Sequence, residues 1–486
     1  MHVTSLPGPY GIGDLGPQAM QWLQTLSSTG TRWWQVLPLG PTGYGDSPYQ
    51  SYSSFAGNPS LISPDLLYED GLIDKDHLEK KPEFPNERVD FAQVIDWKRG
   101  LFQVAFMRLS VLPDLRKEFE AFRHQEHTWL DDFSLFMTIK SQEEQRPWIQ
   151  WPASLRDREP GAILEAVRHY ASTEGYFAFQ QFLFFRQWER LRELMRAANI
   201  GIIGDLPIYC AQDSADVWCR RELFDLDEQG QPINVAGVPP DMFAVTGQRW
   251  GNPLYRWEQH KQDGYAWWQA RLEAVLRMVD VVRLDHFRGF VNYYAVPASE
   301  PTAMNGTWVE GPGVDFLATL KSRMGSLPLI AEDLGGEAHP PVIELRERFD
   351  LPGMKILQFA FDEDLNHRFL PENYPENCVA YTGTHDNDTS IGWFENAPEG
   401  ERQFCLDYLQ SDGKELAWEL LRALWASRAD LTVAPLQDFL ELGSEARMNY
   451  PGQPLGNWGW RVESGALAPE MIDRVAQLNK LAGRAD

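Results

Sequence analysis

The sequence alternates short apolar runs, turns and helical patterns, and this alternation most constrains the fold. The runs are rich in β-branched and aromatic residues, as strands are. They are continuous rather than alternating apolar stretches, which is typical of parallel strands buried on both faces. We expect seven strands, at 33–39, 201–209, 279–287, 329–334, 354–359, 379–384 and 431–436.

Helical patterns separate these runs, so βα units follow one another along the chain. We expect helices at 17–28, 174–198, 265–278, 341–349 and 415–426. A dense phenylalanine stripe in 174–198 is interpreted as a helix face packed on the sheet. Successive parallel βα units predict an α/β fold, a (β/α)8 TIM barrel. The eighth strand would precede residue 33, and we expect it to be clipped at its N-terminal end in this numbering.

The length points to one large body with insertions. At 486 residues the chain exceeds the roughly 250 of a plain barrel. We therefore expect a single catalytic barrel over 1–486. The segment of roughly 58–195 is too long for a simple βα connection, so it is predicted to form an insertion subdomain.

The charge balance narrows the possible partners. The chain has 44 basic and 70 acidic side chains, a net charge of −26, which would repel nucleic acids and anionic membranes. No apolar stretch reaches the roughly 18 residues of a membrane span, and no leader pattern is seen. The four cysteines lack CxxC spacing, so we expect reduced thiols and a cytoplasmic protein.

Aromatic residues make up 13% of the chain, and some of them stand in pairs. Flat aromatic faces stack on the apolar faces of sugar rings as well as on one another. Because these pairs exceed what a core demands, we interpret them as a weak pointer to carbohydrate. They are Trp33 with Trp34, Trp267 with Trp268, and Trp458 with Trp460.

Acidic side chains follow several of the predicted strands. Asp285, Glu332 and Asp386 each come at a strand end, and Asp205 occupies the equivalent position on an earlier strand. The C-terminal ends of parallel barrel strands converge on one mouth, so we expect these acids to meet there. Any one of them alone is more often the cap of a turn or helix than a catalytic group.

Converging carboxylates suit the cleavage of a glycosidic bond. One carboxylate attacks the sugar, while the other stays protonated because neighbouring negative charge raises its pKa. Arg283 faces the same side of its strand as Asp285, so it is a candidate for holding that acid ionised. Metal-dependent hydrolysis is the rival interpretation, but HExxH and cysteine clusters are absent from the sequence. Spacing alone leaves glycoside chemistry only slightly ahead.

Two glycine-rich stretches do not indicate a nucleotide site. The GxGxxG match at 11–16 does not follow a strand, and 40–45 lacks the GK[ST] of a phosphate loop. The second stretch is better interpreted as backbone that brings nearby tyrosines to a ligand.

Eight long motifs carry a family resemblance. The sequence is similar to the 4-α-glucanotransferases, the amylomaltases or disproportionating enzymes among the α-amylase-like glycoside hydrolases. The likeness runs from the second residue almost to the end. It rests on 4–16, 33–59, 235–255, 281–290 (VVRLDHFRGF), 331–335 (AEDLG), 351–361, 381–388 (YTGTHDND) and 445–461 (EARMNYPGQPLGNWGWR).

The resemblance implies a barrel with helical and loop insertions around its C-terminal mouth. It implies retaining transfer of α-1,4-glucan segments from a donor to the 4-hydroxyl of an acceptor glucan or glucose, without metal or cofactor. Asp285 matches the nucleophile, Glu332 the general acid/base, and Asp386 the acid that binds the distorted donor sugar. A lid-like insertion is expected at roughly 212–260, with its loop at 235–255.

The resemblance also implies contacts around the sugars. The residues matching the flanks of the donor subsite are Asp205, Arg283, His286 and His385. Aromatic contacts on the donor and acceptor sides match Tyr49 and Trp250, and a polar contact from the loop after the last strand matches Asn457. The family usually carries a hydrophobic strand before the first motif, and this sequence does not show it.

Two other functions stay open at this point. An α-amylase-type hydrolase would use the same three acids on water. A glucan-binding scaffold would keep the barrel without catalysis, although the retention of all three acids argues against it. The expected partners are the glucan donor and acceptor, and we expect a monomer or weak homo-oligomer.

Overall fold

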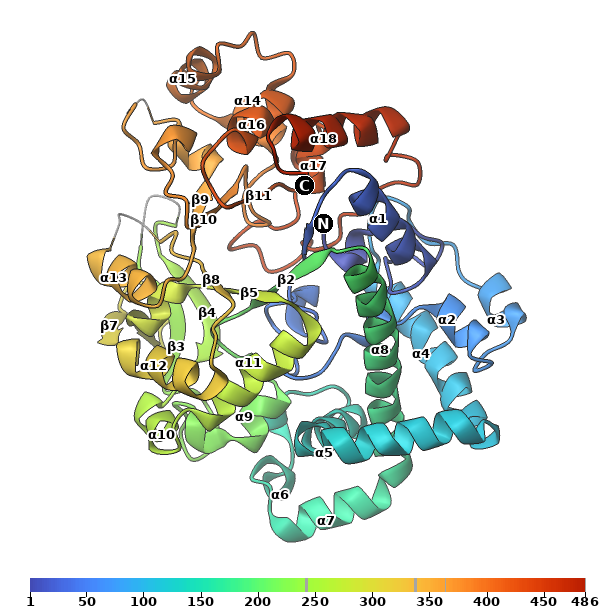
Figure 1. The fold of residues 1–486 in the computed structure, drawn as a ribbon. Helices are drawn as coiled ribbons and strands as arrows, with labels where there is room; N and C mark the ends of the chain where they lie inside the picture. Colours follow the sequence, from blue (N-terminus) through green and yellow to red (C-terminus); the bar gives the residue numbers. More distant parts are fainter. Residues whose placement is uncertain (241–243, 336–338, 363, 486) are drawn as a thin grey trace.

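The computed structural model describes residues 1–240, 244–335, 339–362 and 364–485 (Figure 1). Within them, a seven-stranded sheet has the order β1-β2-β5-β8-β9-β10-β11, and every pairing is parallel. Each strand overlaps one of the predicted runs. The strands are β1 (Trp33–Gln35), β2 (Gly201–Leu206), β5 (Val281–Leu284), β8 (Leu329–Ala331), β9 (Gly353–Ile356), β10 (Cys378–Tyr381) and β11 (Leu431–Val433).

Helices connect these strands in the order expected of a (β/α)8 barrel, so the predicted fold class is confirmed. The five expected helices are present with ends shifted by a few residues at most. They are α1 (Pro17–Ser28), α8 (Ala171–Ala197), α11 (Ala266–Met278), α13 (Pro340–Arg348) and α16 (Leu416–Trp425). Further helices after the central strands are α12 (Gly313–Met324), α14 (Ser390–Asn396), α15 (Glu399–Leu409), α17 (Leu436–Phe439) and α18 (Pro469–Leu481).

The ring of strands has a seam between β1 and β11, which stand at the two ends of the sheet order. A cavity of about 440 Å³ lies there, lined by residues 32–35 and 430–434 and by side chains of α1 and α18. Among the described residues, no strand occupies this gap. The expectation of a clipped eighth strand concerns chain outside this numbering and stays a prediction.

Backbone register places the predicted acids together. Leu206 pairs with Leu284, and Leu284 pairs with Ala331, so β2, β5 and β8 end level with one another. The ladder continues one step further, because the N–H groups of Asp285 and Glu332 donate to the carbonyls of Leu206 and Leu284 at 3.1 Å. Asp285 and Glu332 therefore stand side by side at the C-terminal rim of the barrel.

The long connection from β1 to β2 is helical and lies on one side of the barrel (Figure 1). Its two longest helices, α5 (Pro113–Gln142) and α8, run roughly across each other in Figure 1. The helices before α8 are α2 (Pro64–Glu69), α3 (Lys75–Glu79), α4 (Phe91–Arg108), α5 (Pro113–Gln142), α6 (Ala153–Arg156) and α7 (Pro160–His169). The division into an insertion subdomain stays a prediction.

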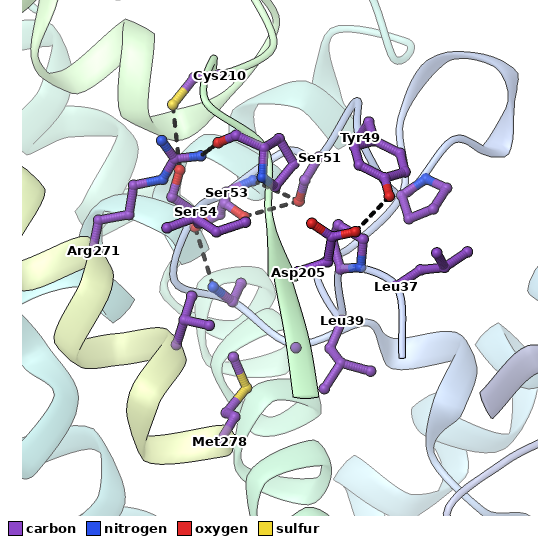
Figure 2. Close-up of a pocket in the computed structure, with 18 of the residues that line it drawn as sticks. Leu37, Leu39, Tyr49, Ser51, Ser53, Ser54, Asp205, Cys210, Arg271 and Met278 are labelled. Carbon is purple, nitrogen blue, oxygen red and sulfur yellow. Dashed lines mark hydrogen bonds between the residues drawn. The ribbon is translucent and has the colours of Figure 1, made fainter. Parts of the chain in front are cut away.

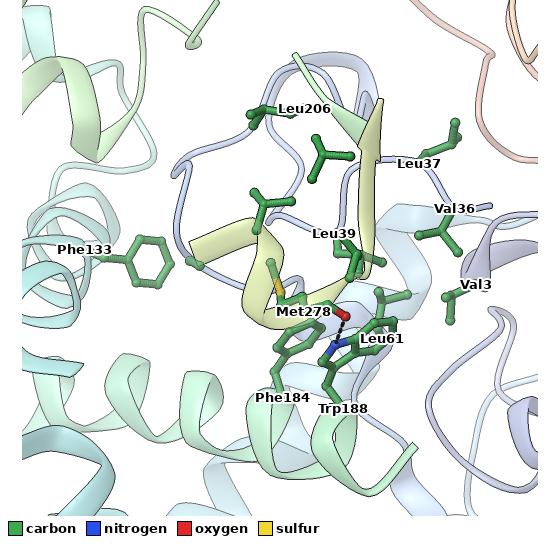
Figure 3. Close-up of a cluster of buried hydrophobic side chains, with 14 of the residues drawn as sticks. Val3, Val36, Leu37, Leu39, Leu61, Phe133, Phe184, Trp188, Leu206 and Met278 are labelled. Atoms are coloured by element: carbon green, nitrogen blue, oxygen red, sulfur yellow. Dashed lines mark hydrogen bonds between the residues drawn. The ribbon is translucent and has the colours of Figure 1, made fainter. Parts of the chain in front are cut away.

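The phenylalanine stripe of α8 was interpreted as packing on the sheet, and for most of the stripe this is wrong. The rings of Phe179 and Phe182 lie 5.5 and 5.6 Å from Phe119 of α5. Only Phe184, stacked on Trp188, faces the barrel side, where the Trp188 indole donates to the Met278 carbonyl at 3.1 Å (Figure 3). Helical periodicity marks a buried face, but it does not say which element covers that face.

A second, antiparallel sheet with the order β4-β3-β6-β7 lies beside the barrel mouth, and we did not predict it. Its strands are β3 (Asn234–Val238), β4 (Gln248–Pro253), β6 (Asn292–Pro297) and β7 (Thr307–Glu310), with α9 (Ala215–Cys219) before them and α10 (Trp257–Gln262) after β4. The loop centre at 241–243 lies outside the described residues, so the expected lid is described only at its flanks.

Most of the paired tryptophans belong to the core. Trp34, Trp267, Trp268, Trp458 and Trp460 are buried, whereas Trp33 is exposed at the seam. Core packing therefore accounts for these pairs, and they are not by themselves evidence for carbohydrate binding.

Candidate active site

Arg283 organises the acids at the ends of β2 and β5. Its Nη2 donates to Asp205 Oδ2 at 2.7 Å and to Asp285 Oδ1 at 3.0 Å, and its Nε donates to Asp205 at 3.0 Å. Burial alone would lower the pKa of the guanidinium, but the surrounding carboxylates and Tyr49 raise it well above its ordinary value. Arg283 is therefore a fixed positive charge that orients Asp285 from within the barrel.

Glu332 is held by the backbone of the neighbouring strand end. Its Oε2 accepts a 2.7 Å hydrogen bond from the N–H of His286, while Oε1 receives only a longer one, 3.3 Å, from Leu334. His286 has a left-handed backbone conformation, with φ of 49°, which is uncommon without a functional or structural reason. That conformation turns the peptide N–H after Asp285 toward Glu332.

The two carboxyl groups differ in their electrostatic surroundings. Burial, and next the charge of Asp285, raise the pKa of Glu332 far above its ordinary value. Burial also raises the pKa of Asp285, but the adjacent Arg283 guanidinium works against this while Asp205 and Asp386 add to it. Of these two carboxyl groups, Asp285 forms an ion pair with Arg283 and Glu332 does not. At neutral pH the proton therefore belongs on Glu332 and the negative charge on Asp285.

Asp205 lies beneath the rim rather than in the opening. Its side chain is 1% exposed, and Oδ2 accepts the Tyr49 hydroxyl at 2.7 Å as well as Arg283 (Figure 2). Its other oxygen, Oδ1, has no hydrogen-bond partner among the described residues. This geometry lets Asp205 position Arg283 and Tyr49, and burial together with the charge of Asp205 raises the pKa of that tyrosine well above its usual range.

Asp386 lies on the loop after β10, and its side chain is 51% exposed. Asn449 donates to its Oδ1 at 2.6 Å, and Arg447 Nη2 donates to its backbone carbonyl at 2.6 Å. Its Oδ2 lies 3.4 Å from His385 Nε2. An acid that is oriented yet open to solvent is suited to binding sugar hydroxyls.

Three aromatic rings gather beside these acids. Tyr49 stacks on His385 with ring centroids 5.2 Å apart, and Trp458 lies 5.7 and 5.8 Å from these two rings. Burial lowers the pKa of His385, so the ring is neutral. Trp458 also has a left-handed backbone, with φ of 66°, which marks it as a residue held in place by its surroundings.

Trp250 of β4 packs against His286, the residue that follows Asp285. Its ring meets the His286 ring edge-on at 5.0 Å, and its indole donates to Gln248 at 3.2 Å. Burial, with a smaller effect from Arg288, lowers the pKa of His286 to about 4, so this ring is also neutral.

Both polar atoms of the Asn457 side chain form hydrogen bonds within its own loop. Its Oδ1 accepts from the N–H of Tyr450 at 3.0 Å, and its Nδ2 donates to the carbonyl of Gln453 at 2.7 Å. A direct contact between Asn457 and substrate stays a prediction.

The residues that hold Asp386 were not among the predicted site residues. Arg447 and Asn449 lie in the quoted motif 445–461, as does Trp458, but no local pattern assigned them a partner more than 60 residues away. The many polar and aromatic residues of that motif are the sequence feature that could have indicated a role for them.

The arrangement can therefore supply an ionised carboxylate beside a protonated one, with neutral rings and an oriented third acid around them. Within the described ranges, no group of three or more His, Cys, Asp or Glu side chains is placed to hold a metal ion. Nor does any helix there have the length and apolar character needed to cross a membrane.

Comparison with known sequences gives a consistent result over the whole chain. A sequence profile of the 4-alpha-glucanotransferase family matches residues 1–467. The 4-alpha-glucanotransferase of Thermus thermophilus is 50% identical over 480 residues, which span 97% of this chain and 95% of that protein. That of Synechocystis is 46% identical over 490 residues, spanning 100% and 97%.

Solved structures agree. Amylomaltase from Streptococcus agalactiae, in complex with acarbose, superposes with a TM-score of 0.97 at 36% identity, covering 100% of this chain and 99% of the other. Amylomaltase from Corynebacterium glutamicum, at 18% identity and a TM-score of 0.76, covers 98% of this chain and 74% of its own, and it shows the shared fold alone.

Proposed function

The chain belongs to the 4-alpha-glucanotransferase family, and from this premise we propose how its side chains perform the reaction. The protein is a transferase that moves α-1,4-glucan segments from a donor chain to an acceptor. The family and its relatives are named for transfer, and nothing in them favours the hydrolase considered from the sequence.

In the first step, the Asp285 carboxylate attacks the anomeric carbon of the donor sugar. The bond from that carbon to the leaving glucan oxygen breaks, and Glu332 gives this oxygen its proton. In the second step, ionised Glu332 takes the proton of the acceptor 4-hydroxyl as the hydroxyl oxygen attacks the same carbon, and the ester to Asp285 breaks. Two inversions give net retention.

One observation carries this assignment. Asp285 and Glu332 directly follow the paired residues Leu284 and Ala331 on adjacent parallel strands. Strands in a sheet are about 4.8 Å apart. Retaining glycosidases place their two carboxyl groups about 5–5.5 Å apart, whereas inverting enzymes need a wider gap for water.

The remaining residues take supporting roles in this proposal. Asp386, together with the Tyr49, His385 and Trp458 rings, holds the donor sugar, and Trp250 with His286 faces the sugar on the other flank. Arg283 orients Asp285, while Asp205 orients Arg283 and Asn457 shapes the loop that carries Trp458. Transfer requires that an acceptor hydroxyl compete with water near 55 M, so positioning and exclusion of water decide the outcome.

We also propose that the enzyme acts in the cytoplasm as a monomer or weak homo-oligomer. The four cysteines are all free thiols, three of them buried, which fits a reducing compartment. Sedimentation at micromolar protein and fractionation of cells test these two points separately.

Incubation with maltotriose tests the function. Transfer gives glucose and a ladder of longer maltodextrins, whereas hydrolysis only shortens the substrate. Glu332→Gln should abolish the ladder while binding of maltodextrin persists. A wild-type protein that produces shortening alone, or a Glu332→Gln variant with near-normal transfer, would contradict the proposal.

A further inference from the structure

An exposed tryptophan lies near the site without a role in the chemistry described above. Trp308 is 41% exposed on β7, the edge strand of the four-stranded sheet. The Arg288 guanidinium carbon lies 4.0 Å from the centroid of its ring, and Tyr294 meets the ring edge-on at 5.2 Å. The indole is therefore oriented by two contacts while a large part of its surface stays open to solvent.

The stacking arginine differs from comparable ones in this chain. Arg158 over Trp218 and Arg474 over Trp418 stack at 4.2 and 4.0 Å, and each of these arginines also binds an acid, Asp132 and Glu415 respectively.

By contrast, Arg288 uses only its Nε, which donates to Asn292 Oδ1 at 3.0 Å. Across the part of the chain that the structure describes, its two terminal nitrogens bind no carboxylate and no carbonyl. In a chain with a net charge of −26, an arginine without an acid partner has donors available for a neutral ligand.

The position of this pair relates it to the acceptor. Arg288 follows Asp285 by three residues, so its backbone lies within about 10 Å of that of the nucleophile. A β-carbon at Gly335, three residues after Glu332, would lie 3.9 Å from Arg288 Cδ. The pair is thus on the Glu332 side, where the leaving glucan departs and the acceptor enters, whereas Tyr49, His385 and Asp386 hold the donor.

We propose that Trp308 and Arg288 form a platform for the distal sugars of a glucan chain on the acceptor side. This inference rests on the proposed function and adds a subsite to it. The indole offers an apolar face for a pyranose ring, and the free guanidinium nitrogens donate to its hydroxyl or ring oxygens. In this proposal the platform binds sugars beyond the first acceptor unit, so long acceptors reach it and glucose does not.

The test compares acceptors of two lengths. Labelled glucose and labelled maltohexaose are each elongated from a fixed excess of unlabelled maltodextrin donor, and kcat/KM is measured for each acceptor. Trp308→Ala should lower the ratio of maltohexaose to glucose efficiency about tenfold, which corresponds to 1.4 kcal/mol of lost binding, and the loss should appear in KM. Trp308→Phe should restore part of the ratio, and Arg288→Met should lower it by about threefold.

Val309→Ala is the matched control, because Val309 is the next residue on the same edge strand and is also exposed. It should leave the ratio unchanged. Equal losses for both acceptors in Trp308→Ala, or no loss for either, would overturn the platform.

Calorimetric titration of maltohexaose into Glu332→Gln, with and without Trp308→Ala, measures the same subsite without turnover. Weaker binding in the double variant supports the platform even if the maltotriose assay shows hydrolysis, and equal binding overturns it. Failure of the proposed function and failure of this inference are therefore distinguishable.

Discussion

The two ends of the β2–β5 strand pair each hold an arginine–aspartate cluster, but the aspartate pKa is lowered in one cluster and raised in the other. At the N-terminal end, Arg192 of α8 binds Asp280 through two hydrogen bonds of 3.0 and 2.6 Å, and the N–H of Ile202 donates to Asp280 at 2.8 Å. Burial opposes ionisation there, but these hydrogen bonds and the charge of Arg192 outweigh it and lower the pKa of Asp280.

At the C-terminal end, Arg283 forms ion pairs with two aspartates, Asp205 and Asp285, and Glu332 lies beside them. The pKa values of Asp285 and Glu332 are raised, not lowered. This difference shows that an arginine–aspartate pair by itself only holds two structural elements together. Reactivity requires more carboxylates than the arginine can satisfy, with one of them left accessible.

The largest effect expected from this comparison is on turnover. Asp285→Asn should reduce the rate of glucan transfer by at least about 10⁴-fold, because no glycosyl-enzyme ester can form. Asp280→Asn, on the same strand segment, should leave kcat intact at a temperature where the protein stays folded. Comparable losses in both variants would show that the two clusters do not differ in function.

The next effect is on pH dependence. Above the raised pKa of Glu332, the rate should fall about tenfold per pH unit as the acid loses its proton. Stability follows the same group: a carboxyl with a raised folded pKa contributes stability that is complete below its ordinary pKa of 4.5 and is lost as pH rises through the raised value.

The pH dependence of the stability that Asp280 contributes has the opposite sign. The lowered pKa of this carboxyl contributes stability above the ordinary value of 3.8, and this is lost as pH falls through the lowered value. Thermal unfolding of wild type and Glu332→Gln from about pH 2 to about pH 9 checks the acid decline and the alkaline decline together. The alkaline decline should shrink in the variant while the acid decline stays, and identical curves would contradict the assignment.

A smaller effect is expected on stability alone. Asp280→Ala leaves the Arg192 charge, 4% exposed, without its partner. Breaking a fully buried pair costs about 3–5 kcal/mol, and we expect about 2–3 kcal/mol because Asp280 is partly exposed to solvent. Denaturant unfolding measures the loss. An unchanged midpoint, or a changed kcat in the folded variant, would remove the distinction between the two ends.

The smallest effect concerns the Tyr49 hydroxyl. Tyr49→Phe removes one hydrogen bond to Asp205 but keeps the ring on His385 and the Arg283–Asp205 pair. We expect kcat/KM to fall about fivefold, equivalent to about 1 kcal/mol. Steady-state kinetics on maltotriose checks this, with Tyr52→Phe on the same segment as the control. A loss above 10³-fold would mean that the hydroxyl touches the reacting atoms.

Local sequence pattern predicted the barrel strands because each is a continuous apolar run whose burial is decided by its own residues. It also placed Asp285 and Glu332 correctly relative to those strands, and parallel register then brings the two acids together. The four-stranded sheet was missed because β4 combines glycine, asparagine and proline, which disfavour strands, and because β7 is exposed along its whole length.

Long-range contacts were the other part that sequence could not reveal. Nothing near Asp386 indicates that Asn449 orients it, and nothing in α8 indicates that its phenylalanines meet α5. Such contacts depend on where whole elements pack, which a residue pattern within one element does not encode.

The place of β5 and β8 in the sheet fixes the spacing of the two reacting acids. Both strands stand near the middle of the sheet order, and each is hydrogen-bonded to a neighbour on both sides. Separating Asp285 from Glu332 would therefore break the β5–β8 ladder, and each strand is also held from its other side. The distance between the two carboxyl groups is thus set by the backbone of the sheet and not by the loops around the site.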